Sequence, residues 1–109
     1  MELTGKCKEE FEKFYLKDID IDECEFFNND TILSIFYTEK ESMQYGVYVD
    51  FFDSVEMDIV IERRRSDLFL FVIYSNCLYG SGFIPDKQSR PKARTAAIEK
   101  ANELYNELY

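Results

Sequence analysis

The sequence predicts an α+β fold, with N-terminal helices, a small antiparallel three-stranded sheet and a long C-terminal helix packed on that sheet. Two stretches lead to this prediction. Residues 89–109, SRPKARTAAIEKANELYNELY, repeat apolar positions at helical spacing, with no Gly and no Pro after the first turn. Residues 68–74, LFLFVIY, form a fully apolar run of strand length. Between the N-terminal half and this run, the apolar period shortens to alternate residues at Met57.

The length and composition of the chain are those of one small domain. Its 109 residues are 46% hydrophobic and 17% aromatic, enough for one core and too few for two ordinary domains. We therefore expect a single domain over residues 1–109. No run of about 18 apolar residues is long enough to span a bilayer, and the charged N-terminus does not look like a signal peptide. These features lead us to expect a cytoplasmic protein.

The cysteine and histidine content argues against metal and redox sites. The chain has no histidine and three cysteines, Cys7, Cys24 and Cys77. The cysteines are widely spaced, and no two of them form a CxxC pair. We expect reduced, mostly buried thiols, no metal and no cofactor. Without histidine the usual general base near neutral pH is missing, and so we expect no enzymatic activity.

The N-terminal half predicts helices separated by an acidic connector. Residues 3–17 form an amphipathic helix with Thr4 as N-cap. The alternating Asp residues that follow resemble the start of a calcium loop, but Glu23 occupies the position that needs Gly, and Asn29 the one that needs a bidentate Glu. We therefore predict a solvated connector there. Residues 31–37 fit a helix capped by Asn29 or Asp30, and equally a strand.

Residues 42–55, SMQYGVYVDFFDSV, are interpreted as a helix capped by Ser42 rather than as a strand. The helical template accounts for two sets of residues at once. The predicted buried stripe consists of Met43, Val47, Tyr48, Phe51, Phe52 and Val55. The predicted solvent-facing set consists of Gln44, Asp50, Asp53 and Ser54.

The C-terminal half predicts a meander followed by a helix. Strands are expected at residues 57–62, 68–74 and 78–84, with a hairpin turn near Arg65 and Ser66 and with two glycines weakening the last strand. Ser89 is the predicted N-cap of the final helix. Its buried stripe is expected to contain Ala93, Ala97, Ala101, Leu104 and Leu108, flanked by Ala96, Ile98 and Tyr105.

The net charge of −9 is unevenly distributed. Residues 1–62 hold 17 acidic and 5 basic side chains, whereas residues 63–109 hold 5 acidic and 8 basic ones. An acidic surface suits docking on a basic protein, because complementary charge steers association. The predicted partner-binding residues, with the tyrosines as exposed anchors, are Tyr45, Tyr48, Asp50, Asp53, Glu56 and Asp58.

A basic group offers a second candidate site. Its members surround the predicted hairpin turn and the first turn of the last helix, where cations oppose the helix dipole: Arg63, Arg64, Arg65, Lys87, Arg90, Lys92 and Arg94. They could contact RNA phosphate or another anion, although a solvated turn and helix start are the simpler interpretation. If residues 31–55 were partly extended, the α–β–β–β–α order would look like a double-stranded-RNA-binding domain. The absence of that family's histidine-bearing loop and the acidic total charge count against it.

Three stretches together resemble a family of small, largely uncharacterised proteins encoded by bacteriophages and prophages: LTGKCKEEFEKFY, ESMQYGVYVDFFDSV and SRPKARTAAIEKANELYNE. In that family the last helix often has Glu at its third position, completing a capping box, whereas this chain has Lys92. The resemblance implies phage origin and no established chemistry, so it identifies no functional residues.

Phage origin leads us to expect an inhibitor of a bacterial host's defence system, acting in the host cytoplasm. The expected target is an RNA-guided CRISPR nuclease with its guide RNA, which makes the chain an anti-CRISPR protein working by protein–protein contact. The alternatives are an RNA-binding accessory protein that uses the basic group, and a structural or regulatory phage protein that assembles with itself.

Overall fold

The computed structural model describes residues 1–18, 28–65, 68–75, 79–85 and 90–109. In chain order the elements are α1 Gly5–Asp18, α2 Asn29–Tyr37, α3 Glu41–Ser54, β1 Asp58–Arg65, β2 Leu68–Tyr74, β3 Tyr79–Pro85 and α4 Arg90–Leu108. The α+β class is confirmed, with helices first, an antiparallel sheet next and a helix last. Several predictions concern residues outside the described ranges: the centre of the acidic connector, the thiols of Cys24 and Cys77, Ser66 in the hairpin turn, Lys87, and the cap at Ser89.

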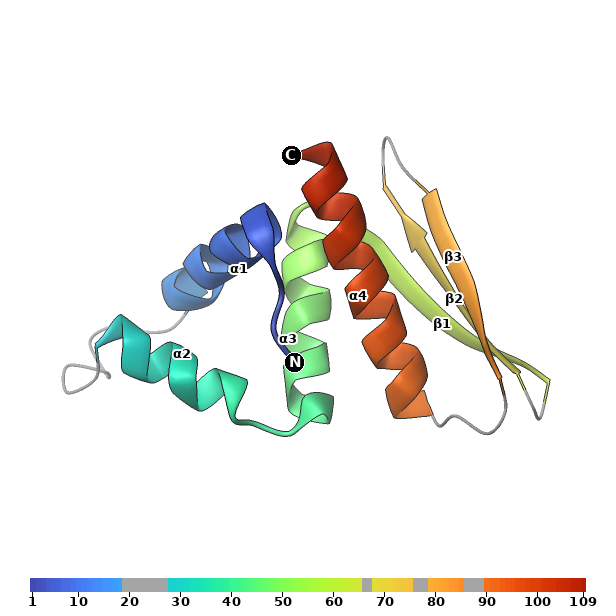
Figure 1. The fold of residues 1–109 in the computed structure, drawn as a ribbon, viewed down its shortest axis with the longest axis horizontal. Helices are drawn as coiled ribbons and strands as arrows, with labels where there is room; N and C mark the ends of the chain where they lie inside the picture. Colours follow the sequence, from blue (N-terminus) through green and yellow to red (C-terminus); the bar gives the residue numbers. More distant parts are fainter. Residues whose placement is uncertain (19–27, 66–67, 76–78, 86–89) are drawn as a thin grey trace.

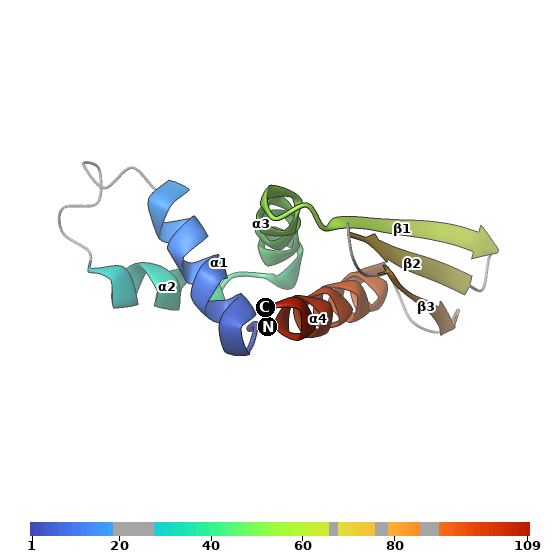
Figure 2. The same cartoon turned by 90° about the horizontal axis from the view of Figure 1, so that it is seen from above.

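The elements form layers along the 48 Å long axis of the molecule (Figure 1). Helices α3 and α4 lie side by side and run in the same direction, and α4 packs on all three strands of the sheet whereas α3 packs on β1. Helix α1 packs on α3 and α4 on the side away from the sheet, and α2 packs on α1. Figure 2 shows the same arrangement from above, and no described helix covers the other face of the sheet.

The sheet has the order β1-β2-β3, and both strand pairs are antiparallel. In the first pair Ile59 lies opposite Ile73 and Arg63 opposite Phe69, and the register shifts between Arg63 and Arg65. Because side chains alternate between faces, the inward positions of β2 are those that join the core, including Phe71 and Ile73. Strand β2 and helix α4 both present apolar residues to the inner face of the sheet, and burial of these residues explains why α4 packs there.

The core is built around aromatic rings from three helices. The Phe11 ring centroid lies 5.2 Å from that of Phe36, 4.8 Å from that of Tyr48 and 5.5 Å from that of Phe51. Such tilted and edge-on pairs contribute about 0.5–1.5 kcal/mol each beyond the area that they bury. Residues 31–37, for which helix and strand were both open, are helical, with Asn28 rather than a later residue as N-cap.

Helix α3 confirms the predicted helix, but its buried face is rotated from the predicted stripe. Met43, expected in the core, is 61% exposed, whereas Gln44, expected in solvent, is 1% exposed. The Gln44 amide nitrogen donates a hydrogen bond of 3.0 Å to the carbonyl oxygen of Phe36, at the end of α2. The buried amide therefore has a hydrogen-bond partner, so its burial does not carry the free-energy penalty of an unpaired polar group. Ser42 is not the cap: Lys40 holds that position without a side-chain hydrogen bond.

Two asparagines of α4 hold the start of α1. The Cys7 amide donates to the side-chain oxygen of Asn106 at 2.9 Å, and the Thr4 amide donates to that of Asn102, also at 2.9 Å. Thr4 precedes the helix as predicted, but its hydroxyl accepts a bond from Asn102 at 2.9 Å, and Asn106 satisfies the helix amide instead. Gly5 has φ +61°, and an added Cβ would lie 3.1 Å from the Asn106 oxygen, so both its backbone conformation and its surroundings favour glycine.

Replacing Asn106 by alanine should destabilise the protein by about 1–2 kcal/mol, because it leaves an amide at the start of α1 without its acceptor. The free energy of unfolding would be measured in urea. Glu107→Ala, an exposed change at the next residue of α4, is the matched control and should change it by less than about 0.5 kcal/mol. Equal free energies of unfolding for the two variants would show that the Asn106 hydrogen bond contributes nothing to stability.

Candidate functional site

Four acidic residues gather where α3 ends and β1 begins, and we call them the acidic corner: Asp50, Asp53, Glu56 and Asp58. All four are exposed. They were predicted as partner-binding residues, and the fold brings them together because a short connection joins α3 directly to β1. The last turn of α3 contains no basic residue, so the Asp53 carboxylate in that turn lies at the negative end of the helix dipole without a compensating charge.

Neighbouring carboxylates raise the proton affinity of Asp53. The pKa of Asp53 is raised, first by partial burial and then by the negative charges of Asp58 and Asp50, and the hydrogen bond that the protonated Asp53 carboxyl donates to Asp58 adds to the shift. Among the residues that the structure describes, no Lys or Arg forms an ion pair with Asp50, Asp53 or Asp58. The corner therefore presents concentrated negative charge to solvent.

The backbone at the corner is also unusual. Glu56 has φ 64°, a left-handed conformation that glycine ordinarily adopts at the end of a helix. The Met57 amide donates to the Phe52 carbonyl at 2.8 Å and the Glu56 amide to the Asp53 carbonyl at 3.0 Å, which is a Schellman motif. A carboxylate thus stands where glycine would be less strained.

The two predicted aromatic anchors differ from expectation. Tyr48 is 1% exposed, so its predicted role as an exposed anchor is wrong. Its ring packs in the aromatic core, and its hydroxyl donates to the Met1 carbonyl at 2.7 Å. Tyr45 is half-buried, and the Arg94 guanidinium lies 5.3 Å from its ring centre. Burial raises the pKa of Tyr45, and the charges of Arg94 and Arg90 partly oppose that shift.

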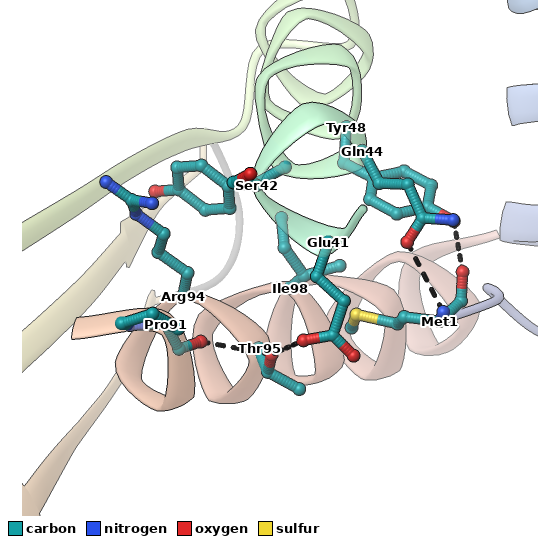
Figure 3. A pocket seen from close by; sticks show the side chains of 10 residues that line it. Met1, Glu41, Ser42, Gln44, Tyr48, Pro91, Arg94, Thr95 and Ile98 are labelled. Atoms are coloured by element: carbon teal, nitrogen blue, oxygen red, sulfur yellow. Dashed lines mark hydrogen bonds between the residues drawn. The ribbon is translucent and has the colours of Figure 1, made fainter. Parts of the chain in front are cut away.

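A shallow groove separates α3 from the first half of α4 (Figure 3). Tyr48 and Ile98 contribute to its apolar lining. At one side the Thr95 hydroxyl is 3.5 Å from a Glu41 carboxylate oxygen and also donates to the Pro91 carbonyl at 3.1 Å. The polar groups of the groove are therefore engaged with one another, and every buried side-chain polar atom described has a partner.

The predicted basic group is only partly assembled around the start of α4. Arg63 of β1 and Arg90 of α4 each place a guanidinium 5.2 Å from the ring centre of Phe69, so one buried phenyl ring carries two cations. Phe69 was missed at the sequence level. No sequence pattern identified it, because its pairing with Arg63 across β1 and β2 depends on the strand register.

The other members of the basic group are less well defined. Lys92 is exposed on the first turn of α4, and the Arg94 guanidinium lies against the Tyr45 ring. Arg64 and Arg65 belong to the end of β1.

Two further observations bear on the kind of site present. In the described ranges no three Cys, Asp or Glu side chains are grouped so that they could hold a metal ion. None of the described helices is both long and apolar enough to cross a bilayer. Cys7 is fully buried, and burial raises the pKa of its thiol to about 12, as expected of a structural cysteine.

Comparison with known proteins gives no match to a protein-family model, to a curated protein or to a solved structure. The resemblance to phage proteins therefore stays a prediction from the three sequence stretches.

The raised pKa of Asp53 predicts how stability depends on pH. As pH rises from the ordinary Asp value of 3.8 through the raised value, the folded state keeps its proton longer than the unfolded state, so stability falls. Asp53→Asn should therefore raise the melting temperature at neutral pH, and the gain should vanish below pH 3.8. Thermal unfolding across this range tests it, with Glu9→Gln on α1 as control. A neutral-pH melting temperature at or below wild type would contradict the expected repulsion.

Proposed function

We propose that this protein is a non-catalytic binding protein that docks its acidic corner on a basic surface of a partner protein. The observation that carries the proposal is the exposed, unpaired cluster formed by Asp50, Asp53 and Asp58. We further propose the biological role of a phage-encoded inhibitor that binds an RNA-guided CRISPR nuclease.

The placement of these charges supports a role in binding. A carboxylate in the last turn of a helix opposes the dipole and costs about 0.3–1 kcal/mol. Asp53 carries that cost, and the charges of Asp50 and Asp58 add repulsion to it. Features that reduce stability are typical of functional sites, where binding compensates for them.

The chemistry of the corner suits a surface that normally binds nucleic acid. Such surfaces concentrate Lys and Arg to neutralise phosphates. Closely spaced carboxylates offer the same surface a rigid array of negative oxygens, and desolvated charge pairs across an interface are strong determinants of affinity. An RNA-guided nuclease has a basic channel of this type. Its choice as target rests on the predicted phage origin.

Reversing the two helix charges should separate binding from folding. Asp50→Lys/Asp53→Lys should weaken partner binding at least about tenfold, since it replaces attraction with repulsion. The same change removes charges that oppose the α3 dipole, so the melting temperature should not fall. Glu9→Lys/Glu99→Lys makes the same change in net charge on α1 and α4, at exposed positions, and is the control.

The test has two parts. Tagged wild type and both variants would be used to capture proteins from a nuclease-treated lysate of bacteria that carry a CRISPR effector. A purified RNA-guided nuclease would then be assayed for DNA cleavage with each protein added. Capture and inhibition by the control but not by the Asp50/Asp53 variant support the proposal. Equal behaviour of the two variants would exclude the acidic corner as the binding surface.

RNA binding is a second candidate, which two observations favour. Residues 31–37 and 41–54 are helical rather than extended, but α3, the three strands and α4 still give the α–β–β–β–α order of a double-stranded-RNA-binding domain. Arg63 and Arg90 also meet at Phe69 beside the start of α4.

On this second proposal Arg90→Glu/Lys92→Glu should abolish RNA binding, and wild-type affinity should fall steeply between low and physiological salt. The measurement is a titration of labelled double-stranded RNA followed by fluorescence anisotropy. Glu99→Lys, which changes charge elsewhere on α4, is the control. No binding of wild type at low salt would eliminate this function.

A further inference from the structure

Strand β1 is an open edge of the sheet. It pairs with β2 on one side only, because the strand order places it at the end of the sheet. In Figures 1 and 2 no described element lies along its outer side. Residues 58–63 keep an unbroken antiparallel register with β2, which shifts only after Arg63. An edge of this kind presents backbone N–H and C=O groups that can form a ladder with another strand.

The inner face of β1, towards the helices, carries apolar side chains whose burial is incomplete. Ile59 and Ile61 pack against the core but are only partly buried. Their neighbours on β2 are Ile73, which is 0% exposed, and Phe71, which is 6% exposed. Apolar side chains of a further strand would contact the two β1 isoleucines and remove more of their surface from water.

The outer face of β1 carries a different set of side chains. Asp58 and Val60 alternate with the two isoleucines and therefore project to the face away from the helices. Val60 is 37% exposed, and Asp58 is an exposed member of the acidic corner. A lysine or arginine opposite Asp58 on an adjacent strand would form a cross-strand ion pair with it. The two faces together favour a segment in which apolar and basic residues alternate.

We propose that β1 binds an extended segment of the partner protein as an additional strand of the sheet, with apolar side chains beside Ile59 and Ile61 and a basic side chain opposite Asp58. The basic partner comes from the proposed function, on which this contact rests, and the backbone ladder is added to it. Docking on the acidic corner by charge alone would not require a ladder. The two proposals can therefore fail separately.

A synthetic peptide of alternating valine and lysine, labelled with a fluorophore, is the probe for this edge. Two further peptides have the same sequence and charge, but carry backbone N-methyl groups either on every valine or on every lysine. Because the N–H groups of successive residues in a strand point to opposite sides, only one of the two methylated peptides loses the donors that face β1. Fluorescence anisotropy should show that the parent peptide binds and that salt weakens its binding. One methylated peptide should bind at least about tenfold more weakly than the other.

The outcomes separate strand addition from docking by charge. Equal affinities of the two methylated peptides would overturn strand addition and leave docking by charge intact. No binding of the parent peptide up to millimolar concentration would also overturn it. Asp58→Lys should weaken binding of the parent peptide at least about tenfold, whereas Glu9→Lys, the same charge change at an exposed position of α1, should leave it unchanged. Equal affinities of these two variants would contradict the basic residue opposite Asp58.

Hydrogen exchange locates the binding surface on the protein. On addition of the parent peptide, exchange should slow at alternate backbone amides within residues 58–63, because those amides face the open edge. The intervening amides face β2 and should change little. Slower exchange elsewhere but not in β1 would exclude this edge. Protection of β1 that rises with protein concentration in the absence of peptide would show a second copy at the edge, and would overturn a partner segment as its occupant.

Discussion

The close approach of α4 to the rest of the molecule is the constraint on which the fold depends. Helix α4 touches α1, α3 and all three strands, and its contact face includes Ala93, Ala97 and Ala101, each fully buried. Small side chains let the helix axis come near its neighbours, while larger residues such as Ile98 and Leu104 fill the space beside them. A larger side chain at these alanines would have to displace several elements at once.

Packing periodicity made much of this fold predictable from sequence. The buried stripe of α4 and the bounds of β2 follow from apolar spacing, which reflects the same geometry in any protein. The phase of α3 was not predictable, because Gln44 is buried by a hydrogen bond to Phe36 that exists only after α2 and α3 meet. The roles of Asn102 and Asn106 were not predictable either, because their hydrogen-bond partners lie about a hundred residues away in the sequence.

The candidate site was predictable in composition but not in arrangement. Asp50, Asp53 and Asp58 are close in sequence, so their clustering could be anticipated. The burial of Tyr48 could not, because an aromatic residue with a polar hydroxyl suits a core and a surface equally well until its neighbours are known. The meeting of Arg63 and Arg90 at Phe69 required the strand register, which sequence alone does not supply.

The parallel direction of α3 and α4 gives the molecule a polarity along these two helices. Their N-termini lie at one end, with Arg90 and Lys92, and their C-termini lie at the other, with Asp50 and Asp53 (Figure 1). In the first turn of α4 and the last turn of α3 the side-chain charges have the same sign as the dipole end, so the two add instead of cancelling. Such a molecule experiences a torque in the field of a charged surface and turns its acidic end towards positive charge before any contact forms. The orientation of the protein would thus be selected while it approaches the charged surface, within a distance that shortens as the ionic strength rises.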